Sequence, residues 1–518
     1  MPGRFVLQHD TTLSGEPGAT EWLRSRVGQA LGIPLPPVTT GDIDITVDAH
    51  RVPDPEGYRL LVTMDRILLV AHDPAGAHYG VQTLRQLLGA HAFRAGVTAA
   101  ERSWVPCVMI VDHPRFRWRG CHLDVARHFM PKRDVLRYID LAAAHKLNVL
   151  HLHLTDDQGW RVEIPQFPEL TRTGSWRKRS MLGRGDPASF DERPHGGYYT
   201  TTDLAEIVSY AATQHITVVP EVDVPGHSQA AIAAYPELGN IPDRQLEVWP
   251  SWGVNEHILN AEESTVQFYR AVFDELMTIF PAEVICIGGD EVPTTEWQNS
   301  PRAIQRASEL GLREPAELHG WFLRRIGEHL REHGRRAMSW DEILDAGIAP
   351  APEVVVASWR GDSGGVRAAE HGHDVVMCPE EAVYLDHRQS DDPREPIPVG
   401  YRRSLADVYH YDPVPDDMPA TVASHLLGAQ AQVWTEHLDS ARAVDYAAFP
   451  RLCAFAEVVW TPRESRDWND FRVRMADCHF SRLDALGVEY RPPAGPWPWQ
   501  TRPGVPGRPA PEPGSEPP

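Results

Sequence analysis

The 518-residue sequence has no long hydrophobic run: no uncharged apolar stretch approaches the roughly 18 residues that a membrane-spanning helix needs. It also has no excess of positive charge, since 50 Lys and Arg stand against 72 Asp and Glu, for a formal net charge of −22. This balance argues against nucleic acid or an anionic membrane as the main partner. Residues 1–15 contain no apolar segment of the kind that a secretory signal peptide carries, so we expect a cytoplasmic location.

The sequence has no cysteine framework either. Its six cysteines are widely spaced, stand mostly in apolar segments and include no CxxC pair, which indicates buried, reduced thiols. What the chain does have is an ordinary globular composition, with 42% hydrophobic and 24% charged residues, and the length for one large domain plus a smaller one. Tryptophan is frequent: 16 Trp outnumber both the 14 Phe and the 14 Tyr.

Residues 1–113 mix short strands with one clear helix. Residues 42–48 alternate strictly between apolar and polar, and 58–64 followed by 66–72 is typical of a β-hairpin. Residues 76–89 place several apolar side chains on one helical face. The pattern predicts a small α+β domain, and it contains no evident group of reactive side chains.

After residue 114 short apolar strands alternate with amphipathic helices. Strands are expected near residues 120–125, 148–154, 217–224, 284–289, 337–340, 354–359, 374–377 and 428–434. Helices are expected at 131–146, 203–215, 262–280, 315–333 and 364–371, the second of them with the capping box Asp203-x-x-Glu206. Eight strands with intervening helices predict an α/β fold: a (β/α)8 TIM barrel over residues 114–490, preceded by the small α+β domain.

The last residues, 491–518, hold 11 prolines in 28 positions. Such a segment offers little that can pack as a regular element, so we expect it to be mostly disordered. The sequence leaves the role of this tail open, and no internal repeat is apparent.

Barrel enzymes carry their reactive groups at the carboxyl ends of the strands. In this sequence the expected strands end in polar and aromatic residues: Asp124, Arg127, His128, His151, His153, Asp156, Asp157, Glu221, Asp223, His227, Asp290, Glu291, Trp340, Asp341, Glu342, Trp359, Tyr384, Asp386, Trp434 and Glu436. Taken singly, a Trp at a strand end is commonly part of a core and a loop carboxylate is commonly solvated. Their convergence on one rim is harder to explain in that way.

The adjacent pair Asp290 and Glu291 is the most informative feature of the rim. It follows an apolar strand that is closed by two glycines, which allow a sharp turn and a close approach to a ligand. Neighbouring carboxylates in a dry pocket push their pKa values apart, which yields one ionised group and one proton donor. That combination suits glycoside cleavage, and Trp-rich walls suit the apolar faces of sugars. The alternative is that the pair merely caps the N-terminus of a helix.

Five motifs in the barrel region carry a family resemblance. They read GCHLDVARHF (120–129), NVLHLHLTDDQGWR (148–161), EVDVPGH (221–227), GGDE (288–291) and QVWTE (432–436). In this order they resemble the family 20 glycoside hydrolases, the β-N-acetylhexosaminidases, from about residue 117 to 460. Residues 1–113 are similar to the non-catalytic α+β domain that usually precedes this barrel, and the tail is not covered.

The resemblance implies an exo-acting, retaining enzyme that removes terminal N-acetylglucosamine or N-acetylgalactosamine from β-linked oligosaccharides or glycoconjugates. The substrate's own 2-acetamido oxygen would attack the anomeric carbon and form an oxazolinium intermediate, with no metal or other cofactor. By similarity Glu291 is the general acid and then the base, and Asp290 holds the acetamido N–H. The resemblance assigns the other contacts to Arg127, Glu436 and Asp386 for the sugar hydroxyls, Tyr384 for the acetamido carbonyl, Trp321, Trp340 and Trp434 for an aromatic box, and Asp156, His227 and His153 as supporting residues.

The sequence departs from the family pattern in one place. Many members have a further Trp between the Tyr384-x-Asp386 motif and the last strand, whereas residues 398–404 contain none before Trp434. Either Tyr401 takes that place or this wall of the site is thinner. The preference between the two sugars, the physiological substrate and the oligomeric state are therefore left open.

Two other functions are compatible with parts of the sequence. The pair His151-x-His153 at a strand end, with His215, His227 and Asp290 downstream, is superficially similar to the metal site of a metal-dependent barrel hydrolase. A carbohydrate-binding barrel that has lost catalysis is the second alternative, and the intact carboxylate pair argues against it.

Overall fold

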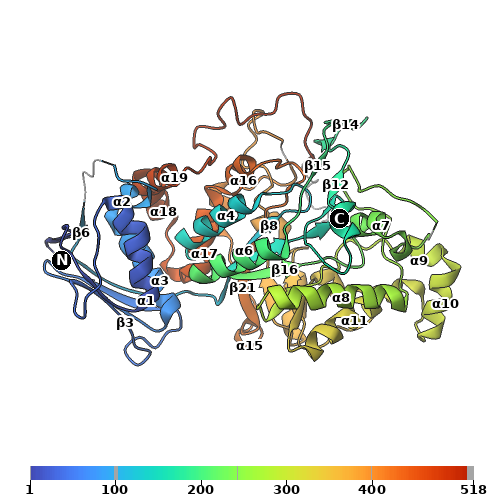
Figure 1. The fold of residues 1–518 in the computed structure, drawn as a ribbon, viewed down its shortest axis with the longest axis horizontal. Coiled ribbons are helices and arrows are strands. Elements are labelled where there is room, and N and C mark those ends of the chain that lie inside the picture. Colours follow the sequence, from blue (N-terminus) through green and yellow to red (C-terminus); the bar gives the residue numbers. More distant parts are fainter. Residues whose placement is uncertain (1, 99–102, 242, 398, 510–518) are drawn as a thin grey trace.

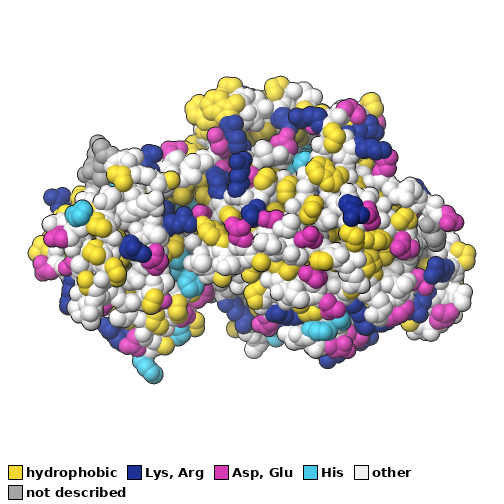
Figure 2. Space-filling model, viewed as in Figure 1, with side chains coloured by type: hydrophobic (Ala, Val, Ile, Leu, Met, Phe, Trp, Pro, Cys, Tyr) yellow, Lys and Arg dark blue, Asp and Glu magenta, His cyan; other side chains and the backbone are white. Residues whose placement is uncertain are grey.

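The computed structural model describes residues 2–98, 103–241, 243–397 and 399–509. Figure 1 shows a small N-terminal domain beside a larger barrel, with the C-terminal segments running over the barrel. Among the described residues, no helix combines the length and the apolar character that crossing a membrane would require. Figure 2 shows acidic and basic side chains interspersed over this face of the molecule, with no large patch of one sign.

The N-terminal domain is built around a five-stranded sheet in the order β2-β3-β5-β4-β7. The expected hairpin is present as the antiparallel pair β4 and β5, and the expected helix is α3, which packs on the sheet. The strands are β1 (Arg4–Val6), β2 (Leu13–Gly15), β3 (Ile43–Val47), β4 (Tyr58–Val62), β5 (Ile67–Ala71), β6 (Trp104–Pro106) and β7 (Val108–Asp112), and the α-helices are α1 (Pro17–Trp22), α2 (Gln29–Leu31) and α3 (Pro74–Leu88).

Eight parallel strands close into a barrel, which confirms the predicted (β/α)8 fold. Side chains on barrel strands are buried on both faces, so the strands are mostly apolar in the sequence, with buried polar exceptions such as Arg119 and His151. The barrel strands are β8 (Trp118–Asp124), β9 (Val149–His153), β16 (Thr217–Glu221), β17 (Val284–Cys286), β18 (Arg336–Trp340), β19 (Val355–Ser358), β20 (Val375–Met377) and β21 (Leu426–Ala431). Each corresponds to one of the eight strands expected from the sequence.

The five expected helices are also present, as α4, α6, α8, α11 and α12, with bounds that differ by a few residues. The α-helices after the N-terminal domain are α4 (Lys132–Ala144), α5 (Glu169–Arg172), α6 (Thr201–Thr213), α7 (Gln229–Ala234), α8 (Glu263–Ile279), α9 (Thr295–Asn299), α10 (Pro301–Glu309), α11 (Leu318–Glu332), α12 (Asp362–Glu370), α13 (Glu380–Val383), α14 (Leu405–His410), α15 (Ala420–Ala423), α16 (Ala441–Ala448), α17 (Arg451–Trp460), α18 (Trp468–Arg474) and α19 (Phe480–Ala485). Between β18 and β19 the connection carries a 3-10 helix, Asp341–Leu344. Short strand pairs in the loops are β10 (Thr155–Asp156) with β11 (Gly159–Trp160), β12 (Trp176–Arg177) with β15 (His195–Gly196), and β13 (Met181–Leu182) with β14 (Ser189–Phe190).

The capping box of α6 lies three residues earlier than the sequence suggested. Thr200 is the N-cap, its hydroxyl accepts from the backbone N–H of Asp203 at 3.1 Å, and the Asp203 carboxylate accepts from the backbone N–H of Thr200 at 3.1 Å. The expected box of Asp203 with Glu206 is therefore wrong. Asp203 already stands one turn inside the helix, where Lys132 pairs with it and with Glu206.

All six cysteines are free thiols. Five of them are buried, as expected, but Cys478 is exposed. It lies in the π-helix Met475–His479 after α18, in the C-terminal segment that packs on the N-terminal domain. There Arg482 donates to the backbone oxygen of Gln86 at 3.0 Å.

Candidate active site

A cavity of about 490 Å³ opens at the carboxyl ends of the barrel strands. Eight residues that the sequence analysis assigned to the site line it: Arg127, Asp290, Glu291, Trp340, Tyr384, Asp386, Trp434 and Glu436. The three supporting residues, Asp156, His153 and His227, lie beneath this lining and are at most 4% exposed. The barrel thus brings together side chains from β8 at one end of the sequence and β21 at the other.

The turn after β17 places Asp290 and Glu291 at the cavity. Gly288 and Gly289 both have positive φ angles, and a side chain on Gly288 would put its Cβ 1.7 Å from Oδ1 of Asp223. The backbone N–H of Gly289 donates to that same Asp223 oxygen at 3.0 Å. Glu291 itself has a φ of 45°, a conformation that few non-glycine residues adopt. Because the strand has ended, the two neighbouring carboxylates can line the same cavity.

His227 lies below the carboxylate pair and joins it to the barrel floor. Its Nε2 is 3.6 Å from Oδ2 of Asp290 and 3.4 Å from Oε2 of Glu291, and its Nδ1 is 3.2 Å from Oδ1 of Asp156. Burial alone would lower the pKa of His227, but the charges of Asp156 and Asp290 outweigh it and hold the pKa well above its ordinary value. A positively charged imidazole therefore stands beneath the two acids.

Asp290 combines burial with an unused oxygen. Burial raises the pKa of its carboxyl group above the ordinary value, Glu221 and Glu291 add to that rise, and His227 opposes it. Its Oδ1 is buried and accepts no hydrogen bond from an N–H group of the described part of the chain, while the neighbouring Asp223 carboxyl group favours its ionised form. Such an acceptor is costly to bury unless a ligand completes it.

Arg127 lines the cavity and is held in place by contacts on several sides. Its Nη2 forms an ion pair with Oδ2 of Asp156 at 2.7 Å, its Nε donates to Oε1 of Gln158 at 3.2 Å, and its guanidinium lies 4.9 Å from the ring centroid of Trp434. Although burial opposes it, the charges of Arg127 and His227 keep the pKa of Asp156 well below its ordinary value. Asp156 thus orients a cation on each side of it.

Beneath the cavity lies a buried series of hydrogen-bonded side chains with His153 at its centre. Its Nδ1 is bonded to Glu221 and its Nε2 lies 3.0 Å from Asp156. Burial alone would lower the pKa of His153, but Glu221 and Asp156 raise it to about 10. The other oxygen of Glu221 accepts from the indole Nε1 of Trp340 at 2.9 Å. The same network therefore orients the ring of Trp340.

Aromatic rings form the walls. Trp340 and Trp434 lie 5.9 Å apart between ring centroids, and Tyr384 lies 6.1 Å from Trp434. Trp359 completes the group: it is nearly parallel to Tyr384, and its indole N–H donates to both carboxylate oxygens of Glu342, at 3.0 and 2.9 Å. All four rings line the cavity. The indole Nε1 of Trp434 is buried and has no partner among the described residues.

The structure does not bring Trp321 to this group. It lies on α11, with the guanidinium groups of Arg306 and Arg325 at 5.0 and 5.4 Å from its ring centroid, and it is not among the residues that line the cavity. Trp359, which the sequence analysis placed at a strand end without assigning it to the box, stands in the wall instead. In the sequence, Trp321 and Trp359 both stand in apolar surroundings, one in a helix and one at a strand end. Which of them faces the cavity depends on how α11 packs, and the sequence pattern does not give this.

Tyr401 lines the cavity, in the segment without a further Trp. It lies 5.7 Å from His387 with the two rings nearly parallel, and its backbone N–H donates to Nδ1 of His387 at 3.1 Å. Pro398, in the same segment, lies outside the described residues. Three further lining residues, Arg184, Trp252 and Arg508, come from loops and from the tail. No spacing pattern marked them, because each stands in an irregular segment.

The residues of the metal-site hypothesis do not meet at one point. His151 and His153 both face Glu221, and His227 faces Asp156 and Asp290. His215 precedes β16 at the opposite end of the barrel and packs on His78 of the N-terminal domain, 5.2 Å between ring centroids. What the cavity does hold is a carboxylate pair, a rigid arginine and an aromatic wall, a set that suits acid–base chemistry on a sugar.

Two family models match the chain. "Glycosyl hydrolase family 20, catalytic domain" matches residues 116–463, and "Glycosyl hydrolase family 20, domain 2" matches residues 1–113. A β-hexosaminidase from Porphyromonas gingivalis is 39% identical over 91% of this chain and 59% of its own length, so the chain spans less than two thirds of that relative. A β-hexosaminidase from Akkermansia muciniphila is 35% identical over 82% of this chain and 83% of its own length.

Solved structures of enzymes with related names are also similar to this chain. The exo β-N-acetylglucosaminidase of Vibrio harveyi, in complex with N-acetylglucosamine, is 33% identical, with a TM-score of 0.83 over 95% of this chain and 76% of that one. The N-acetyl-β-hexosaminidase of Streptomyces plicatus is 30% identical, with a TM-score of 0.82 over 96% of this chain and 95% of that one.

Proposed function

The chain belongs to glycosyl hydrolase family 20, and on that premise we propose that it is a retaining β-N-acetylhexosaminidase that releases terminal N-acetylhexosamine residues by substrate-assisted catalysis. One observation carries this proposal: Asp290 and Glu291 stand side by side in a cavity lined by four tryptophans and two tyrosines. The buried, unpartnered Oδ1 of Asp290 supports it, since this acceptor matches the N–H of a 2-acetamido group.

In the first step the acetamido oxygen of the substrate attacks the anomeric carbon and the bond to the leaving oxygen breaks. Glu291 gives its carboxyl proton to that oxygen, so the aglycone leaves as a neutral alcohol. The sugar is left as a bicyclic oxazolinium ion whose positive charge is spread over the former amide. Asp290 accepts the hydrogen bond from the amide N–H and stabilises this charge.

In the second step water attacks the anomeric carbon and the bond to the acetamido oxygen breaks. Glu291, now a carboxylate, takes a proton from the water, and the product keeps the β-configuration after two inversions. Burial raises the pKa of Asp290, and the positive charge of His227 opposes that rise, so His227 favours the ionised carboxylate that both steps need.

The walls select the sugar. Trp340, Trp359 and Trp434 enclose the acetamido group and exclude water from it, and the hydroxyl of Tyr384 donates to the acetamido carbonyl. Arg127, Asp386 and Glu436 bind the hydroxyls of the terminal sugar. The substrates are accordingly β-linked N-acetylhexosaminides, as free oligosaccharides or on larger glycoconjugates.

Initial rates on aryl β-glycosides of N-acetylglucosamine, N-acetylgalactosamine and glucose test the proposal. Without the acetamido group the substrate lacks its nucleophile, so the glucoside should be cleaved orders of magnitude more slowly. A thiazoline mimic of the intermediate should inhibit strongly, and activity should survive exhaustive chelation. Comparable rates on the glucoside and the N-acetylglucosaminide would show that the mechanism is wrong, and loss of activity on chelation would favour the metal-dependent alternative.

A further inference from the structure

The described part of the C-terminal tail follows a defined path over the barrel. Arg491 binds Glu395 and Ser390 at 2.8 and 2.9 Å, Arg502 pairs with Asp439, and the backbone oxygen of Pro506 accepts from the backbone N–H of Arg184 at 2.8 Å. We call residues 497–509 the C-terminal arm. The family model for the catalytic domain ends at residue 463, so the arm lies beyond the matched part of the chain.

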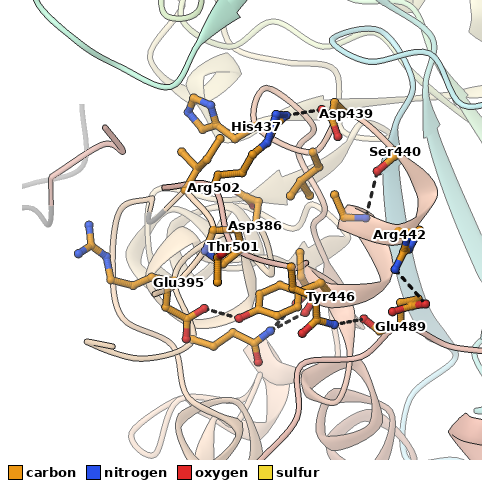
Figure 3. A pocket seen from close by; sticks show the side chains of 18 of the residues that line it. Asp386, Glu395, His437, Asp439, Ser440, Arg442, Tyr446, Glu489, Thr501 and Arg502 are labelled. Atoms are coloured by element: carbon orange, nitrogen blue, oxygen red, sulfur yellow. Dashed lines mark hydrogen bonds and ion pairs between the residues drawn. The ribbon is translucent and has the colours of Figure 1, made fainter. Parts of the chain in front are cut away.

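The arm covers a second cavity, of about 190 Å³, next to the catalytic one. Thr501 and Arg502 of the arm line this cavity together with Asp386 and His437, which come from the loops at the carboxyl end of the barrel (Figure 3). Asp386 and His437 line both cavities. The arm therefore lines both cavities, with residues 499–502 at the smaller one and Arg508 and Pro509 at the catalytic one.

Arg508, near the end of the arm, lines the catalytic cavity itself. Its Nη2 donates to Oε1 of Glu380 at 2.6 Å, and its backbone oxygen accepts from Nη2 of Arg388 at 2.7 Å. The Glu380 side chain is only 3% exposed, and its other close partner is His387, at 3.2 Å. A buried carboxylate paired with arginine holds its partner firmly, because breaking the pair leaves an uncompensated charge.

Arg508 lies on the side of the catalytic cavity where the residues assigned to the sugar hydroxyls stand. Arg508, Asp386 and Glu436 line the same cavity, and although burial opposes it, the charges of Glu380, Asp386 and Glu436 raise the pKa of the Arg508 guanidinium. Asp386 and Glu436 are the two carboxylates assigned above to sugar hydroxyls, whereas the leaving group is served by Glu291. Arg508 thus lies where a substituent on the terminal sugar would point.

We propose that the C-terminal arm is part of the sugar-binding wall and that Arg508 is a specificity-determining residue, which closes the catalytic cavity beside Asp386 and Glu436 against terminal sugars that carry a substituent on that side. This inference rests on the proposed function. It names the accepted substrate class as N-acetylhexosaminides whose terminal sugar carries no substituent on the side of Asp386 and Glu436.

Three chain lengths and two substitutions test the proposal. The full chain, a chain ending at Pro509 and a chain ending at Pro496 are compared on an aryl β-N-acetylglucosaminide and on its 4-O-methyl and 6-O-methyl derivatives. The full chain and the chain ending at Pro509, which both keep Arg508, should reject at least one methyl derivative. In the chain ending at Pro496, kcat/KM for that derivative relative to the parent should rise at least tenfold, and KM for the parent should rise.

Single substitutions cover the case in which the shorter chain does not fold. In the full chain, Arg508→Ala should raise the same ratio at least threefold, and Arg508→Lys, which keeps a cation beside Glu380, should stay closer to the wild type. A ratio within twofold of wild type in both the chain ending at Pro496 and the Arg508→Ala variant would overturn the inference; if the shorter chain does not fold, the Arg508→Ala variant alone decides. Failure of the proposed function is distinct, because then the full chain does not cleave the parent substrate at all.

Discussion

Two buried networks of charge lie at opposite ends of the same barrel, and they differ in how far their hydrogen bonds are completed. At the amino end, Arg119 joins the barrel to the N-terminal domain and is fully buried. It donates twice to Glu56, at 2.9 and 3.0 Å, and once each to the Tyr79 hydroxyl and the backbone oxygens of Phe116 and Lys146. These five bonds use all five N–H groups of the guanidinium.

At the carboxyl end the network is incomplete. Oδ1 of Asp290, Oδ1 of Asp386 and the indole N–H of Trp434 are buried without hydrogen-bond partners among the described residues, and all three residues line one cavity. Burial also raises the pKa of Asp386 well above its ordinary value, with the charge of Glu436 adding to the rise.

The difference separates a structural network from a binding one. Both ends contain the same residue types at similar burial, so burial and charge alone do not distinguish them. Satisfied groups stabilise the contact between the domains, whereas unpaired acceptors and donors around a cavity are free to bind a polar ligand. Substitutions at the two ends should therefore affect different properties.

The largest effect is expected from Glu291→Gln at the incomplete end. Loss of the proton donor should lower kcat/KM on natural oligosaccharides by about 10²–10⁴-fold, with much less loss on aryl glycosides whose phenolate leaves unaided. The midpoint of thermal unfolding should stay within a few degrees of wild type, since Gln keeps the shape of the side chain. A Brønsted series of aryl N-acetylglucosaminides, with thermal melts, measures both.

Asp290→Asn is the matched variant for that series. Because Asp290 acts on the acetamido group whatever is leaving, this change should slow good and poor leaving groups to a similar degree. Equal slopes for the two variants, or a steeper slope for Asp290→Asn, would show that the roles of the two carboxylates are assigned wrongly.

The next effect is on stability, from Arg119→Met at the complete end. Removing one partner of a buried ion pair costs about 3–5 kcal/mol, and we expect the lower value because the Glu56 side chain keeps 21% of its surface exposed. The folded enzyme should keep its kcat/KM within twofold. The control is Arg117→Met, because the exposed Arg117 side chain is 3.7 Å from Asp374. In urea unfolding, this change should lower the free energy of unfolding by less than about 1 kcal/mol. Strong loss of activity in folded Arg119→Met protein would contradict the separation of the two ends.

A smaller effect distinguishes two equally buried tryptophans. Trp359 and Trp321 are 6% and 7% exposed, but only Trp359 lines the cavity. Loss of a stacking ring is worth roughly 1–3 kcal/mol by analogy with base stacking, so Trp359→Ala should lower kcat/KM at least tenfold. Trp321→Ala should lower stability and leave kcat/KM of the folded protein nearly unchanged. The reverse pattern would return Trp321 to the aromatic box.

The smallest effect is a shift of the pH profile in His227→Gln. The charge of His227 lowers the pKa of Asp290, so its removal lets that pKa rise. Since Asp290 must be ionised to act, the acid limb of kcat/KM should move to higher pH by roughly one unit. His215→Gln, at the amino end, should leave the limb in place. An acid limb that stays put or moves to lower pH in His227→Gln would show that His227 does not set the ionisation of Asp290.

The sequence by itself determined the barrel and the core of its site. The barrel strands are short and mostly apolar because both of their faces are buried, so the eight strands could be predicted within a few residues. The carboxyl ends of parallel strands meet on one face, and for that reason Arg127, Asp290, Trp340 and Glu436 could be expected to converge.

Only the tertiary structure decided the rest of the wall. The capping box moved from Asp203 and Glu206 to Thr200 and Asp203, because local patterns fix a helix start only to within a few residues. Trp359, and not the predicted Trp321, stands in the aromatic wall, because Trp321 packs on α11 away from the cavity. Arg508 comes from a proline-rich segment with no periodicity of its own. Its position depends on contacts with Glu380 and Arg388, more than a hundred residues earlier, and no local pattern in the sequence encodes such a contact.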